Sequence, residues 1–194
     1  MSGSKEMVVE ARGVFVPGTQ LDDVFEMLLL DSIKGGEETR KAVCEIFPRV
    51  VTQETAEAAR THPKTGVKIV KLKVVFSGQG WEGITGKLIE RLTQVETESM
   101  VKFTPGVSIV INNVNTSHAN MFKTHTHTEL VINPDEEGVI RFHSKLTFVS
   151  MAIPAMILSP LWTKLAEVFS QEAPGLVSSV EMFREKFPRP SLSQ

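Results

Sequence analysis

The sequence is poor in the features that mark disulfide-rich, membrane-spanning and nucleic-acid-binding proteins. It contains one cysteine, Cys44, which excludes an internal disulfide and a cysteine metal site and suits a reducing compartment. Its longest apolar run, Met151–Leu158, contains a proline and is far shorter than the ~20 residues of a spanning helix. The formal net charge of −2 gives no electrostatic reason to expect nucleic acid as a partner.

The first residues also lack the apolar core of a signal peptide and the arginine-rich pattern of a transit peptide. We therefore expect a cytoplasmic protein without stable membrane insertion. The length of 194 residues and the ordinary content of apolar residues, 41%, suit one globular domain. We expect this domain over residues 6–187, with flexible tails at residues 1–5 and 188–194.

The first part of the chain predicts one strand followed by short helices. Glu6–Val16 is rich in valine and ends before a Pro-Gly pair, which favours a strand. Thr19, with an acid three residues later, is typical of the cap of a helix whose apolar face extends from Leu21 to Leu29. Gly35-Gly36 is expected to end this helix. Glu37–Phe47 and Thr52–Arg60 are two further helical candidates.

The middle of the chain predicts antiparallel strands. The segment Ile84–Val95 fits either a helix or a half-exposed strand, and Pro105-Gly106 suits the middle of a type II turn. The predicted strands are Val67–Phe76, Thr97–Thr104, Val107–Val114, His118–Ile132 and Val139–Phe148.

The pattern of apolar and polar residues in the last two predicted strands indicates how these strands pair. If Ile132 lies opposite Ile140, one face of the hairpin carries only apolar or small side chains, and the other carries the charged residues and histidines. A shift of one residue would mix apolar and charged partners on both faces, so burial should select the first pairing. The apolar face would then lie against the C-terminal helix.

The C-terminal segment predicts a long amphipathic helix. Ser159-Pro160 is a favourable helix start, and apolar residues then recur with a helical period as far as Phe187. Because this period continues across Pro174-Gly175, we expect one helix with a kink there.

The alternating pattern His125-x-His127-x-Glu129 is the sharpest chemical motif. Alternate strand residues share a face, so these groups, with His143 on the next strand, could hold a metal as in a cupin-like enzyme. The predicted register directs them to solvent beside Lys145, whose charge opposes a cation. We therefore favour an exposed polar strand face without a metal.

A second motif, the G-x-G-x-x-G pattern at residues 78–83, raises the possibility of a dinucleotide site. The strands that follow it predict hairpins and no βαβ unit, so we interpret the motif as a glycine-rich turn with Trp81 at its tip.

Three stretches resemble the START/polyketide-cyclase (SRPBCC, helix-grip) superfamily. They are the early helix with Asp22–Leu28, the strands Glu98–Ile132 with their Pro-Asp-Glu-Glu-Gly loop, and the segment from Arg141 through Trp162 into the terminal helix. The resemblance covers about two thirds of the chain. It implies an α+β helix-grip fold, in which a curved antiparallel sheet wraps around a long C-terminal helix with an apolar cavity between them. It implies no catalytic residue and no cofactor.

The main functional hypothesis is a carrier or sensor of a hydrophobic small molecule such as a lipid, a sterol or a polyketide. The residues expected to line its cavity, or to form the core there, are Leu130, Ile132, Ile140, Phe142, Leu146, Phe148, Leu165 and Phe169. One alternative is a cyclase or dehydratase with Glu129 and His143 as an acid–base pair in the same cavity. Another is an interaction module with Trp162, Phe169 and Phe183 on one exposed apolar patch.

Overall fold

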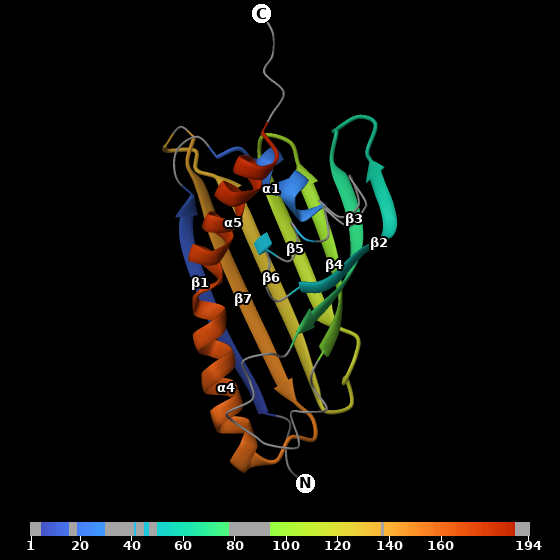
Figure 1. Cartoon of the computed structure of the whole chain (residues 1–194), viewed down its shortest axis with the longest axis vertical. Helices are drawn as coiled ribbons and strands as arrows, with labels where there is room; N and C mark the ends of the chain where they lie inside the picture. Colours follow the sequence, from blue (N-terminus) through green and yellow to red (C-terminus); the bar gives the residue numbers. More distant parts are fainter. Residues whose placement is uncertain are drawn as a thin grey trace, which may run out of the picture.

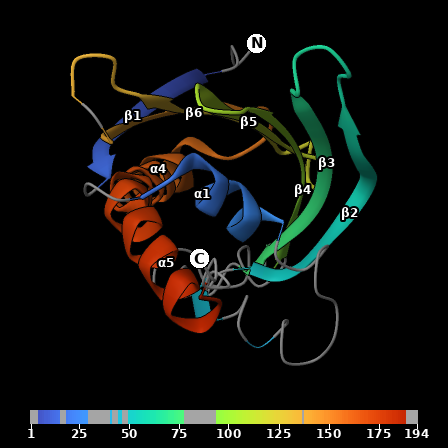
Figure 2. The same cartoon turned by 90° about the horizontal axis from the view of Figure 1, so that it is seen from above.

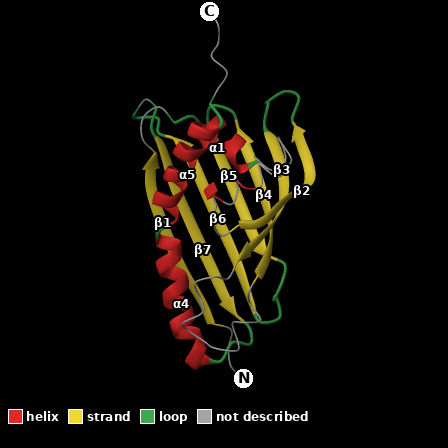
Figure 3. Cartoon of the chain, viewed as in Figure 1, coloured by secondary structure: helices red, strands yellow, loops and turns green. Residues whose placement is uncertain are grey.

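The described strands form one antiparallel sheet that curves around the helices (Figure 1, Figure 2). This arrangement is the predicted α+β helix-grip fold. Figure 3 shows the helices on one side of the sheet, and the view from above in Figure 2 shows that this is its concave side. The computed structural model describes residues 5–15, 19–29, 41, 45–46, 50–77, 94–136 and 138–188.

The seven described strands follow the spatial order β1-β7-β6-β5-β4-β3-β2, and each neighbouring pair is antiparallel. The first strand therefore pairs with the last, and β1 and β2 form the two edges. The strands are β1 (Lys5–Phe15), β2 (Val50–Thr61), β3 (Lys68–Ser77), β4 (Gln94–Thr104), β5 (Ser108–Asn115), β6 (Phe122–Ile132) and β7 (Ile140–Ser150).

The register predicted for the last hairpin is confirmed. Ile132 pairs with Ile140 and Glu129 pairs with His143, as burial of the apolar face requires. The turn between β4 and β5 is confirmed as well, because Gly106 has a φ of +68° and the Val107 amide donates to the Thr104 carbonyl oxygen at 3.0 Å.

The helix predicted over Thr52–Arg60 is wrong, since these residues belong to β2. Their alanines and glutamates favour a helix in isolation, but helix propensity is a weak preference that tertiary pairing overrides. β2 pairs with β3 through several register shifts, and the buried side chain of Gln53 donates a hydrogen bond to the Leu28 carbonyl oxygen. Mostly exposed polar side chains suit such an edge strand.

The C-terminal helical segment also differs from its prediction. It consists of α4 (Ala155–Ser170) and α5 (Glu172–Lys186), which meet at Gln171. The helix begins before the predicted Ser159-Pro160 start, so Pro160 lies inside α4. The break precedes Pro174, which therefore falls in the first turn of α5, where a missing backbone N–H costs little.

The early helix α1 (Leu21–Leu28) is confirmed, but it ends before the predicted stop at Gly35-Gly36, and the predicted Thr19 cap is wrong. The N-cap residue is Gln20, and its side chain makes no capping hydrogen bond. Two acids in the first turn, Asp22 and Asp23, instead complement the positive end of the helix dipole.

Several predictions fall largely outside the described residues. Of Glu37–Phe47 only residues 41, 45 and 46 are described, and these are helical. Of Ile84–Val95 only the last two residues are described, at the start of β4. Cys44, Trp81 and most of the predicted tails lie outside the description. No described helix has both the length and the apolar character needed to cross a membrane.

Candidate functional site

The inward face of the sheet carries a group of uncharged polar side chains halfway along its central strands. Strand alternation and the register direct them to the same face as buried residues such as Ile109 and Leu130. We call this group the inner polar belt. Its members are Thr97, Ser99, Asn113, Asn115, Thr124, Thr126, Thr128 and Ser144.

Part of the belt was visible in the sequence. The predicted β6–β7 register already directed the threonines and Ser144 inward as small side chains. The contributions of β4 and β5 were missed, because they depend on how those strands pair with each other and with β6. The alternation of Thr97 with Ser99, and of Asn113 with Asn115, is the signal that could have revealed them.

Along β6 the belt lies between residues of two apolar clusters. The larger cluster contains α1, parts of α4 and α5, and inward residues of the sheet as far as Val74 on β3 and Leu146 on β7, with Phe103 and Leu130 among its fully buried members. The smaller cluster consists of Phe122, Phe148, Ile153, Leu158 and Leu161. Leu165 packs against both clusters and is only half-buried.

Leu165 is less buried than its neighbours on the inward stripe of α4. Leu165 lies on the inward stripe of α4 between Leu161 and Phe169, whose exposed fractions are 3% and 2%. Val9 and Ile111 also face inward and remain half-buried. A tightly packed interior would bury such apolar side chains as completely as their neighbours.

Hydrogen bonds satisfy some members of the belt. The hydroxyl oxygens of Thr128 and Ser144 lie 2.7 Å apart. The Asn115 side chain donates to the carbonyl oxygens of Ser117 at 2.7 Å and Phe122 at 3.2 Å, and it accepts from the Thr124 amide at 2.7 Å. These members hold the strands together.

Two other members differ. Asn113 and Thr126 are paired across β5 and β6, and both are half-buried. Within the part of the chain that the structure describes, neither side chain has a hydrogen-bond partner, and the same holds for the buried Ser99. Their polar groups are thus available on the inward face.

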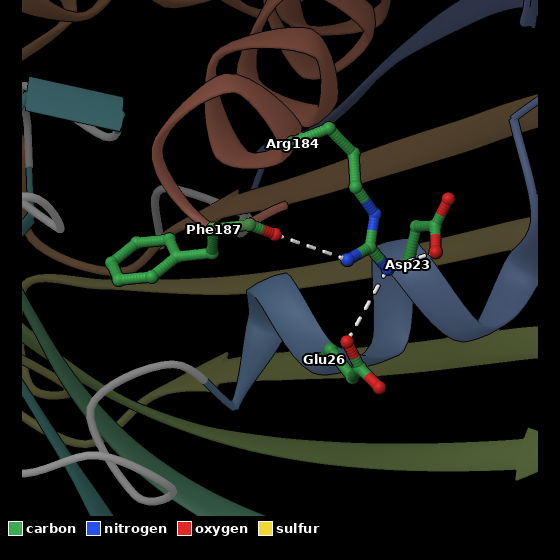
Figure 4. A network of polar contacts seen from close by, with 4 residues as sticks. All are labelled: Asp23, Glu26, Arg184 and Phe187. Carbon is green, nitrogen blue, oxygen red and sulfur yellow. Dashed lines mark hydrogen bonds and ion pairs between the residues drawn. The ribbon is translucent and has the colours of Figure 1, made fainter. Parts of the chain in front are cut away.

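Charged groups near the interior lie at the α1 end. Lys68 lies 5.6 Å from the ring centre of Phe25 and 5.7 Å from that of Phe103. Arg184 of α5 binds the buried carboxylate of Asp23, and its guanidinium lies 3.3 Å from Glu26 (Figure 4). These ion pairs fasten α5 to α1.

The structure distributes the eight predicted lining residues between the two clusters. Leu130, Ile140, Phe142, Leu146, Phe148 and Phe169 are buried, and only Ile132 and Leu165 remain half-buried. Most of these residues therefore belong to the packed core, and Leu165 contacts both clusters. Phe169 and Phe183 are buried and Trp162 is half-buried, so they form no exposed patch for a partner.

The histidine motif lies on the outer face. His127 is 3.0 Å from Glu129 and 2.8 Å from Asn112, and His143 is 3.4 Å from Glu10. The hydrogen bond from His143, together with Arg12, holds the pKa of Glu10 below its ordinary value. Within the described residues no group of three or more potential ligands could hold a metal ion. Because Glu129 and His143 lie on the outer face, they cannot serve as an acid–base pair for a substrate in the interior.

A shallow hollow of about 370 Å³ opens on the same outer face, across β2 to β5. Its rim includes Met100, Val114 and the ion pair between Lys71 and Glu57. The hollow lies on the other side of the sheet from the inner polar belt.

No family model and no curated protein matches this sequence. Among solved structures, the chain is similar to the Zhui aromatase/cyclase from Streptomyces sp. R1128, with a TM-score of 0.51, 15% identity, and coverage of 95% of this chain and 98% of that chain. Human STARD10 gives a TM-score of 0.52 at 11% identity, with coverage of 93% of this chain and 66% of that chain. Ara h 8.0201 gives a TM-score of 0.50 at 12% identity, with coverage of 94% and 99%.

The chain therefore has a START/SRPBCC-like fold, as the sequence resemblance implied. At these identities the likeness establishes the fold, and function has to be argued from the site.

Proposed function

We propose that the protein binds a hydrophobic small molecule, of the lipid, sterol or polyketide kind, between the concave face of its sheet and helix α4. Its proposed role is that of a carrier or sensor of this molecule. The observation that carries the proposal is the half-buried Leu165 between two fully buried neighbours on the inward stripe of α4. Accessible apolar surface in the middle of a fold is the usual lining of a ligand site.

The chemistry of the inward face supports binding over acid–base catalysis. At the inward positions of β4 to β7 there are hydroxyl, amide and apolar groups, and no carboxylate or imidazole. The acid–base pair suggested by the sequence, Glu129 and His143, lies outside. General acid–base catalysis requires groups within hydrogen-bond reach of the substrate.

Helix α4 provides a direct test. The variant Leu165→Trp adds bulk at the half-buried position and should occupy the space that the proposal assigns to the ligand. We expect it to reduce the uptake of Nile red, a neutral apolar fluorophore, while the melting temperature remains close to that of the wild type. Thr163→Trp, on the exposed face of the same helix, is the matched control.

Equal Nile red binding by the wild type, Leu165→Trp and Thr163→Trp would contradict this location for the site. Failure of the wild type to bind any apolar probe would contradict the proposed function itself.

A further inference from the structure

The inner polar belt suggests which kind of hydrophobic molecule the site accepts. Resting on the function proposed above, we propose that the ligand is uncharged and carries a hydrogen-bonding group, such as a carbonyl or hydroxyl, in its interior. Asn113 and Thr126 are the residues that bind this group.

The first step of the argument is the pairing state of the belt. Thr128 bonds to Ser144, and Asn115 bonds to backbone groups and Thr124, so these polar groups are already satisfied. Asn113 and Thr126 face the same side from adjacent strands, without a partner in the described part of the chain. Half-buried polar groups in an apolar site gain from a partner that the ligand brings.

The second step is the absence of a compensating charge. Across β4 to β7 the described inward positions carry no lysine, arginine or histidine. Among the described cations, Lys68 and Arg184 lie at the α1 end, against aromatic rings or with acidic partners. A carboxylate beside the belt would lose its hydration without gaining an ion pair, which is costly. The belt therefore favours a neutral group.

The third step is the position of the belt between apolar surfaces. Phe142, Leu130 and Ile109 lie on one side of it, and Phe122 and Phe148 lie on the other. A ligand that extends along the strands would meet apolar surface, then the belt, then apolar surface again. Its polar group should therefore lie between two apolar parts. A molecule with one polar end fits this pattern less well.

Three probes of equal carbon number test this inference. They are 6-undecanone, with a carbonyl in mid-chain, undecane, with no polar group, and undecanoate, with a charged end. Affinities can be measured by displacement of Nile red at pH 8. We expect 6-undecanone to bind more tightly than undecanoate.

Two variants remove the polar groups with little change in shape, Thr126→Val and Asn113→Leu. Because one net hydrogen bond is worth roughly 0.5–1.5 kcal/mol, each variant should bind 6-undecanone roughly 2- to 13-fold more weakly than the wild type does. Undecane, which makes no hydrogen bond, should bind to the variants at least as tightly as to the wild type. Thr147→Val makes the same change on the outer face of β7 and should alter none of the affinities.

The outcomes separate the two proposals. The belt does not select the ligand if the variants lose no more affinity for 6-undecanone than for undecane. The same conclusion follows if the wild type binds undecanoate as tightly as 6-undecanone. The proposed function would survive that result. If Nile red and all three probes fail to bind the wild type, the proposed function fails and this inference fails with it. Thermal unfolding of each variant shows whether it is folded.

Discussion

Thr128 and Ser144 join β6 to β7 through a hydrogen bond of 2.7 Å between their hydroxyl oxygens, on the inward face of the sheet. Ser144 has no exposed surface, so its hydroxyl depends on this partner. Beside them, Asn113 and Thr126 lack such a partner within the described residues. The inner polar belt thus contains one set of groups for holding the sheet together and another that we assign to the ligand.

Thr128→Val should therefore lower the free energy of unfolding by about 1–3 kcal/mol, because it leaves the buried Ser144 hydroxyl without a partner. Adding Ser144→Ala should cost less than the sum of the two single changes, since the orphaned group is removed as well. Chemical denaturation of the four proteins measures this coupling. Strictly additive effects would show that the two hydroxyls do not depend on each other.

Arg184→Met should destabilise the contact between α1 and α5. Asp23 is 5% exposed, and the change removes the guanidinium that its buried carboxylate binds. We expect the free energy of unfolding to fall by about 2–3 kcal/mol. This value is at the low end for a buried ion pair, because water still reaches part of the Arg184 side chain.

Arg12→Met is the matched control for that change, since the ion pair of Arg12 with Glu10 is exposed and should contribute far less to stability. In a background that carries Asp23→Asn, Arg184→Met should cost much less than in the wild type. The same loss in both backgrounds would refute the importance of the Asp23 contact.

Gly106→Ala should destabilise the β4–β5 turn by about 1–2 kcal/mol, because its φ of +68° is unfavourable for residues with a Cβ atom. A Cβ atom there would meet no neighbour within 4 Å, so backbone strain is the expected cause. Gly175→Ala offers a contrast. This glycine lies in α5 with equally free surroundings, and alanine should stabilise the helix by about 0.5–1 kcal/mol. Equal effects at the two positions would contradict the turn geometry.

Acid should weaken the attachment of the edge strand β2. The hydrogen bond from Lys71 lowers the pKa of Glu57 below its ordinary value of 4.5. A carboxyl with a lowered pKa in the folded state stabilises the fold above pH 4.5, and this contribution is lost as the pH falls through the lowered value.

The difference in unfolding free energy between the wild type and Glu57→Gln should accordingly be largest near neutral pH and should shrink below pH 4.5. Glu54→Gln, on the same strand, is the control, because Glu54 has no ion-pair partner among the described residues. A difference that grows on acidification would have the wrong sign.

The β6–β7 hairpin was predictable because burial of one face permits only one register. Leu130 must lie opposite Phe142 if Glu129 and His143 are to reach water. The fold class followed from the order of strands and from the resemblance to helix-grip proteins, which the structural comparisons support.

The errors arose where local preference and tertiary contacts disagree. Thr52–Arg60 has the composition of a helix, and only its pairing with β3 makes it a strand. Ser159-Pro160 resembles a helix start, but α4 begins earlier and includes that pair. The part of the inner polar belt on β4 and β5 escaped prediction for a related reason, since Asn113 and Thr126 become neighbours only when β5 pairs with β6.

Native mass spectrometry tests the central claim most directly. The purified protein is incubated with a total lipid extract, separated from it, and measured beside a denatured sample. We predict an added mass of lipid size on the native protein that disappears on denaturation, and a weaker adduct for Leu165→Trp. An unchanged protein mass after incubation, in both the native and the denatured sample, would contradict the proposal that this fold holds a hydrophobic ligand.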